Sequence, residues 1–109
     1  MTTGEVEAMV RETGLPFSYY LFTKDTAVSP PFICYYYQTS EDLYADGINY
    51  ARFSQLVIEL YTDKKDFALE NRVESVLSGH ELSYERQETY ISEELMYMVV
   101  YTMEVCIDA

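Results

Sequence analysis

The chain has 109 residues, of which 19 are acidic and 7 are basic, so its formal net charge is -12 and its pI is about 4.2. This length fits one domain over residues 1–109. The hydrophobic content of 49% excludes a disordered acidic chain, and no apolar run is long enough to span a membrane. The negative charge argues against nucleic-acid binding through a basic patch.

The N-terminal part is predicted to form a helix and a strand. Thr2 and Glu5 have the spacing of a capping box, and the apolar residues that follow share one helical face, which predicts a helix over residues 3–13. The aromatic segment 17–22 predicts a strand. Polar residues and a Pro-Pro pair predict a loop over residues 24–31.

The middle of the chain has the strongest strand pattern. Residues 32–37 are dense in aromatic and β-branched side chains and predict a second strand, whereas the polar, acidic residues 38–47 predict a solvated loop or turn, with a long hairpin connection as an alternative. Residues 49–61 predict a third strand, which we expect to be central because both of its faces are partly apolar. The alternation puts Leu56, Ile58 and Leu60 on one face and Phe53, Val57 and Tyr61 on the other.

The C-terminal part is predicted to form a helix and two strands. Asp63 is the predicted N-cap, with Asp66 three residues later, and apolar residues at helical spacing then predict a helix over residues 64–78. Residues 82–91 and 96–107 alternate and predict two strands, although Arg86 and Glu88 interrupt the apolar face of the first.

The order α-β-β-β-α-β-β favours an α+β fold, a mostly antiparallel sheet with two helices packed on one face. The other sheet face would be rich in tyrosine and partly exposed, and a large exposed apolar face usually marks an interface. The candidate interface residues are Tyr35, Tyr37, Phe53, Val57, Glu59 and Tyr61.

Residues that often carry chemistry are few. Cys34 and Cys106 lie in apolar runs without CxxC spacing, which favours buried thiols in a reducing compartment over a disulfide between strands. His80, the only histidine, follows a helix end and is interpreted as a loop or capping residue. No nucleophile motif or phosphate-binding glycine loop is present, so we expect no catalytic residue, cofactor or metal.

Several carboxylates are candidate ligands of a metal ion. Asp42 and Asp46 flank a glycine-containing turn, but the alternating oxygen ligands of a calcium loop are missing. Glu88, Glu93 and Glu94 surround one strand end, where they would either bind a divalent ion weakly or keep a sheet edge soluble, and we favour the second.

Glu59 differs from the other acids because it interrupts an otherwise apolar strand. A carboxylate in that position needs a partner or water. Arg52 or Arg72 would serve as the partner, and the sequence does not decide between them. Glu59 is therefore interpreted either as an interface contact or as part of an exposed strand face.

Four segments in order, with the last strand, suggest a family. They are PFICY at 31–35, the end of the acidic loop at 45–46, IELYTDKKD at 58–66 and ETYISEE at 88–94, before the strand 98–105. Together they resemble a family of small proteins encoded in prophages and tailed phages beside the major tail protein. The resemblance covers about residues 15–105.

The family is similar to the tail terminator, or tail completion, proteins of long non-contractile tails. The resemblance implies a small α+β structural protein, not an enzyme, that forms a six-membered ring on the end of the tail tube and joins the tail to the head connector. The implied partners are further copies of the chain, the major tail tube protein and the connector proteins. The implied location is the tail or neck of the virion, after assembly in the cytoplasm of the host bacterium.

The negative charge agrees with that role. DNA that passes through a ring must slide without specific binding, which a lumen that repels phosphate permits. The candidate lumen residues are, first, Glu41, Asp42 and Asp46 and, second, Asp63 and Asp66. Two alternatives remain: an acidic DNA mimic that inhibits a host nuclease, and a neck protein on the head side.

Overall fold

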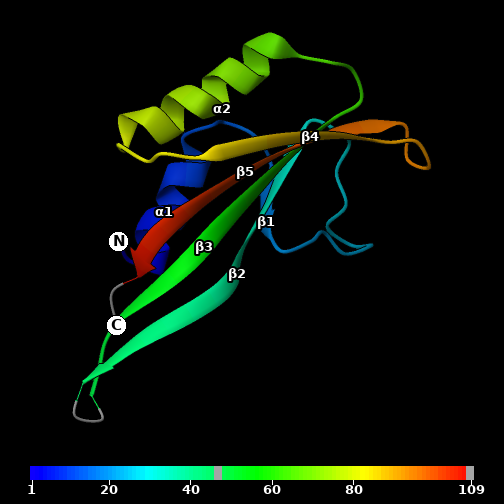
Figure 1. Cartoon of the computed structure of the whole chain (residues 1–109). Coiled ribbons are helices and arrows are strands. Elements are labelled where there is room, and N and C mark those ends of the chain that lie inside the picture. Colours follow the sequence, from blue (N-terminus) through cyan, green and yellow to red (C-terminus); the bar gives the residue numbers. More distant parts are fainter. Residues whose placement is uncertain (46–47, 108–109) are drawn as a thin grey trace.

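A five-stranded sheet with two helices on one face makes up the chain (Figure 1). The computed structural model describes the backbone of residues 1–45 and 48–107, and the side chains of these residues except 39–53. The elements in order are α1 (Thr3–Arg11), β1 (Phe17–Tyr19), β2 (Phe32–Ala45), β3 (Ile48–Thr62), α2 (Phe67–Gly79), β4 (Glu85–Ile91) and β5 (Met96–Ile107).

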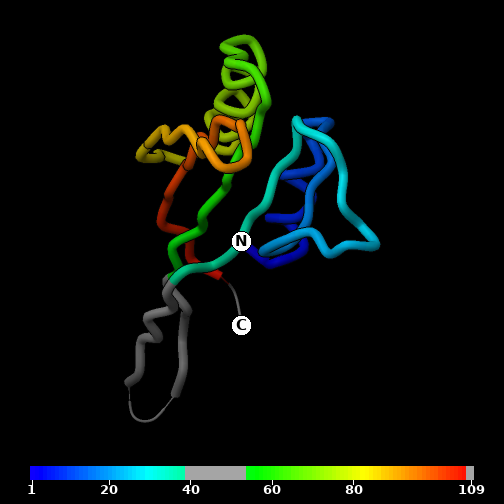
Figure 2. The backbone as a smooth tube through the Cα atoms, turned by 90° about the vertical axis from the view of Figure 1, so that its right-hand side faces the viewer, coloured from blue at the N-terminus to red at the C-terminus, as the bar shows by residue number. Residues whose placement is uncertain are grey.

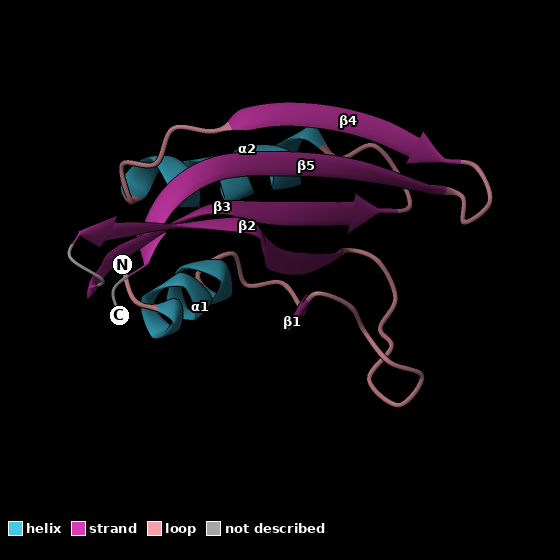
Figure 3. Cartoon of the chain, turned by 60° about the horizontal axis from the view of Figure 1, so that its bottom comes forward, coloured by secondary structure: helices cyan, strands magenta, loops and turns pink. Residues whose placement is uncertain are grey.

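The strands lie in the order β1-β2-β3-β5-β4 (Figure 3). β1 pairs with β2 in parallel, and the other three pairings are antiparallel. This is the predicted α+β architecture with the predicted order of elements. β3 is central, as its two apolar faces indicated.

Both helices contribute to one core against the sheet. The buried apolar residues come from α1, α2 and alternate positions of β2, β3 and β5, and include Val6, Met9, Val10, Ile33, Leu56, Ile58, Leu60, Leu69, Val73, Leu77, Val99 and Tyr101. The N-terminus lies beside the end of β5, where the Met1 amino group donates a hydrogen bond to the Cys106 carbonyl at 2.8 Å (Figure 2).

The first helix begins where predicted and ends earlier. The Thr2 hydroxyl accepts a hydrogen bond from the Glu5 amide and the Glu5 carboxylate accepts one from the Thr2 amide, so the capping box is confirmed. The helix ends at Arg11, not at Thr13, whose hydroxyl instead donates to the Val10 carbonyl at 2.7 Å. Gly14 then adopts a positive φ of 75°.

Two predictions about β1 and β2 were wrong. β1 stops at Tyr19 because Tyr20 turns the chain with a φ of 71°, a left-handed conformation that ends an extended strand. The predicted loop over 38–47 is strand as far as Ala45, because this backbone continues to pair with β3. Polar composition alone suggested a loop, but strand pairing is made by the backbone and tolerates polar side chains.

The second helix begins three residues later than predicted. Asp66, not Asp63, is the N-cap: its backbone is non-helical, and its carboxylate accepts a hydrogen bond from the Leu69 amide at 3.0 Å. Sequence spacing did not distinguish these two aspartates, since either has the side chain that an N-cap needs. The helix ends at Gly79, with His80 as its C-cap.

β4 is shorter than predicted, and its charged residues do not interrupt its pattern. It begins at Glu85, not at Leu82. Arg86 pairs with Tyr101 and Glu88 with Val99 on β5, so both lie on the helix-covered face. The predicted alternation of β5 is confirmed, because the residues from Val99 to Ile107 that share a face with Tyr101 are buried.

Candidate assembly surface

The sheet face opposite the helices is the candidate site. We call it the open face, and its central positions are Phe32, Cys34 and Tyr36 of β2, Val57, Glu59 and Tyr61 of β3, and Met98, Val100 and Thr102 of β5. Apart from the buried Cys34 and Val57, these side chains are half-buried. Such a face combines apolar area with tyrosine hydroxyls, which is typical of protein interfaces.

Glu59 lies in the middle of the open face. Its strand neighbours are Cys34 on β2 and Val100 on β5. The Tyr61 hydroxyl donates to one carboxylate oxygen at 2.8 Å, and the Tyr36 hydroxyl lies 3.4 Å from the other. Glu59 forms no ion pair with any described residue, so its carboxylate is held in place by the two tyrosine hydroxyls.

Burial and Glu59 together change the ionisation of the neighbouring groups. Burial, and then the hydrogen bond to Glu59, raise the pKa of Tyr61 above its ordinary value. Burial, followed by the negative charge of Glu59, raises the pKa of the Cys34 thiol to about 11. Tyr36 has a raised pKa for the same two reasons. These three groups are therefore neutral near pH 7.

The loop after β1 folds over one end of the open face and forms a pocket there. Tyr20 packs on Tyr36 with ring centroids 5.1 Å apart, Phe22 packs edge-on against Phe32 at 5.2 Å, and Phe32 stacks on Tyr61 at 4.9 Å. We call this the aromatic pocket. It encloses about 250 Å³ and is lined by Tyr20, Leu21, Phe22, Ala27, Val28, Phe32, Cys34, Tyr61 and Glu94.

Charge is distributed unevenly between the two sides of the sheet. Among the described strand positions, the open face carries Glu59, Glu85 and Glu104 and no lysine or arginine. Five of the seven basic residues lie in or beside the helical layer: Arg11, Lys64, Lys65, Arg72 and Arg86. The charged positions described on the open face are therefore all acidic, whereas the helical layer carries charges of both signs.

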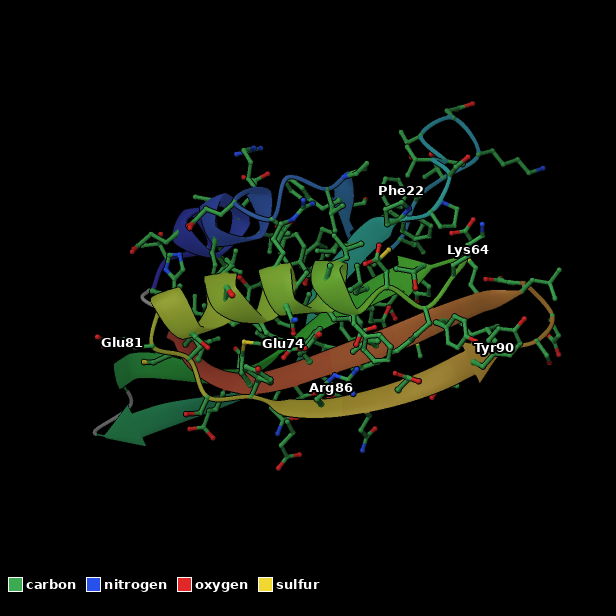
Figure 4. All side chains as sticks on the ribbon, turned by 90° about the horizontal axis from the view of Figure 1, so that it is seen from above. Phe22, Lys64, Glu74, Glu81, Arg86 and Tyr90 are labelled. Atoms are coloured by element: carbon green, nitrogen blue, oxygen red, sulfur yellow. The ribbon has the colours of Figure 1, made fainter. Side chains whose placement is uncertain are left out.

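A second polar cluster joins α2 to β4 on the helix-covered side (Figure 4). Glu70 is only 3% exposed, and it forms ion pairs with Lys65, at 2.6 Å, and with Arg86. Glu74 accepts hydrogen bonds from the hydroxyls of Tyr101, at 2.8 Å, and Tyr84, at 3.3 Å. Because each charge has partners within the fold, this cluster holds α2 on the sheet.

The structure separates the candidate interface residues into two sets. Val57, Glu59 and Tyr61 lie on the open face, as proposed from the sequence. Tyr35 and Tyr37 do not: they pair with Ile58 and Leu56 and face the helices, because Tyr35 belongs to the core alternation. The Phe53 side chain lies outside the described residues.

The candidate lumen residues are not brought together among the described residues. Asp46 and the side chains of Glu41 and Asp42 lie outside the described part of the chain. Asp63 is exposed, and Asp66 is used as the N-cap of α2. The aromatic pocket was missed because the loop after β1 forms one wall, and a sequence pattern does not show where a loop folds.

His80, the carboxylates and the cysteines form no recognisable catalytic group in the described residues. The His80 ring nitrogen contacts Glu12 at 2.6 Å, a link between the ends of the two helices, and the cysteines are free. Among the described side chains, no three His, Cys, Asp or Glu residues are placed to hold a metal ion. No described helix has the length and apolar character to cross a membrane.

Comparison of the whole sequence with protein-family models and with curated proteins gives no match.

Proposed function

We propose that the chain is a structural protein of a phage virion that closes the end of the tail tube as a six-membered ring and joins the tail to the head connector. The observation that carries this proposal is the ordered set of segments across residues 15–105, which resembles the tail terminator family. The α+β fold that the resemblance implies agrees with the observed two helices and five-stranded sheet.

The open face supports an assembly role. A ring built head to tail needs two different surfaces on each subunit, which meet at every contact. The open face supplies one surface, with half-buried aromatic and aliphatic side chains around the fixed carboxylate of Glu59. The helical layer is the candidate for the other surface because it presents exposed basic side chains, Lys64 and Arg72, that form no ion pair with a described residue.

The acidic character of the chain supports passage of DNA without specific binding. A ring of six copies multiplies the net charge of -12, and negative charge at a lumen repels phosphate. Glu41, Asp42 and Asp46 remain the first candidates for the lumen, and Asp63 and Asp66, which are both exposed, remain the second. Cryo-electron microscopy that places both groups on the outer wall would overturn this assignment.

The test is to mix the purified chain with tail tubes assembled from the major tail protein encoded beside it. Negative-stain electron microscopy should show a ring on one end of each tube, and addition of the chain during assembly should stop tube growth. Bovine serum albumin at the same concentration is the control. Tubes that keep growing with bare ends would contradict the proposal.

The same preparation tests the alternatives. A salt-sensitive complex with a host nuclease, and no ring at any concentration by mass photometry, would favour the DNA mimic. Its acidic surface should resemble a row of free phosphates, but Glu70, Glu74 and Glu88 are partnered within the fold. A ring that binds the head connector and never the tube would favour a neck protein.

A further inference from the structure

The aromatic pocket carries negative charge that no described residue neutralises. Glu94 lines the pocket, and Tyr61, which also lines it, donates its hydroxyl to Glu59. Neither glutamate forms an ion pair with a described residue, and no described lysine or arginine lines the pocket. One carboxylate thus lines this small aromatic space and a second is hydrogen-bonded to its wall, with no described cation in the lining.

Aromatic walls and carboxylates together select one class of ligand. The ring faces of Tyr20, Phe32 and Tyr61 attract a cation, and a nearby carboxylate adds a direct charge contact. The alkyl stem of a lysine or arginine would cover the apolar wall while its charged group meets the carboxylate. An anion or a nucleic-acid phosphate would be repelled, since every charge at the site is negative.

The chain itself offers suitable cations that do not line the pocket. Arg72 on α2 and Lys64 just before α2 are exposed, and neither forms an ion pair with a described residue. Arg72 belongs to a helix on the face opposite the pocket, so it meets a pocket only in another copy. Figure 4 shows the helical layer from this side, with Lys64 labelled.

We propose that the aromatic pocket of one copy binds a basic side chain from the helical layer of the next copy, Arg72 or Lys64, and that this contact sets the head-to-tail order of the ring. The proposal rests on the proposed function in one respect only, that copies of the chain associate. It predicts a contact between a carboxylate of the pocket and a basic side chain, so assembly should weaken as salt is raised.

Charge-reversed variants test this contact. Glu94→Lys places a cation in the pocket, and the double variant Lys64→Glu, Arg72→Glu places acids on the helical layer. Each should need about tenfold or more protein to assemble, because like charges meet at every contact. Glu93→Lys is the matched control: it makes the same charge change at the neighbouring exposed residue, which does not line the pocket. Near-ultraviolet circular dichroism verifies that each variant is folded.

Mixing the two variants gives the sharpest result. In a ring that alternates them, every pocket meets an opposite charge, so a one-to-one mixture should assemble where neither variant does alone. Assembly is measured by mass photometry in free solution and by electron microscopy on tail tube ends. The variants carry tags of different mass, so that the mass of a ring shows whether it contains equal numbers of both, as alternation requires.

The outcomes separate this proposal from the proposed function. If Glu94→Lys assembles as well as Glu93→Lys, the pocket contact is wrong, even where rings still cap tubes. If neither variant assembles alone and their one-to-one mixture also does not assemble, the aromatic pocket does not bind a second copy of the chain. If the charge-reversed variants form rings only when mixed, but the rings do not bind tail tubes, the pocket contact is supported and the proposed function is overturned. A wild-type chain that associates neither alone nor on tubes overturns both.

Discussion

Replacing Arg86 tests whether the polar cluster between α2 and β4 holds the helix in place. The Arg86 guanidinium contacts Glu70, lies 3.6 Å from Glu74 through Nε and 3.3 Å from Glu88 through Nη2. The Glu70 side chain is 4% exposed, and Lys65 is the one other cation that contacts it among the described residues. Arg86→Met keeps most of the alkyl stem and removes the charge, so Glu70 stays buried with one cation instead of two.

The expected loss follows from the burial of Glu70. Removing one partner of a fully buried ion pair costs about 3–5 kcal/mol. The Arg86 side chain is 35% exposed and Lys65 remains in place, so solvent screening and the second cation reduce the loss. We expect Arg86→Met to lower the free energy of unfolding by about 2 kcal/mol, with a fall in Tm of about 8 °C.

Urea unfolding measures this change. The chain has 12 tyrosines and no tryptophan, so near-ultraviolet circular dichroism of tyrosine follows the tertiary structure. Arg72→Met is the matched control, because Arg72 is exposed on the neighbouring helix and has no ion pair with a described residue; its effect should stay within about 0.5 kcal/mol. If Arg86→Met destabilises the fold no more than Arg72→Met, the cluster does not hold α2 as argued.

Three further predictions concern the core, the pH dependence and the thiols. Leu77→Ala, at a position 1% exposed, should lower the free energy of unfolding in urea by about 3 kcal/mol, and a loss under about 1 kcal/mol would mean that α2 does not pack as described. Burial raises the pKa of Tyr37 from 10.0 to about 12 and that of Cys34 from 9.0 to about 11. The folded state therefore holds these protons more tightly than the unfolded state, and stability should fall as the pH rises from about 9 to about 12. The midpoints of urea unfolding between pH 9 and pH 12 measure this fall in stability, and unchanged midpoints would contradict the burial of these groups. Iodoacetamide at pH 8 should modify the half-buried Cys106 well before Cys34, as peptide mass spectrometry will show; equal rates would place Cys34 at the surface.

The sequence predicted the parts of the fold that rest on periodicity. The alternation of β5 identified its buried face, and the capping box of Thr2 and Glu5 located the start of α1. Both signals depend on contacts within a few residues, or on a repeat that burial imposes on a whole strand. For the same reason the central position of β3 followed from its two apolar faces.

The predictions that were wrong concern features that depend on contacts between distant segments. The backbone of residues 38–45 is strand because β3 pairs with it, and nothing in its polar side chains indicates that pairing. In the sequence, Arg86 interrupts the apolar pattern of a strand. The structure explains its position, because Arg86 forms an ion pair with Glu70 of α2. The candidate site was predicted in part: Glu59 was identified by its position in an apolar strand, but its tyrosine partners and the aromatic pocket required the loop after β1.

Electron microscopy of tail tube ends tests the central claim most directly. With the chain present, class averages of tube ends should show an added ring of six copies, and tube growth should stop. Single-copy or dimeric protein in solution, with tube ends unchanged at every concentration of the chain, would contradict the account.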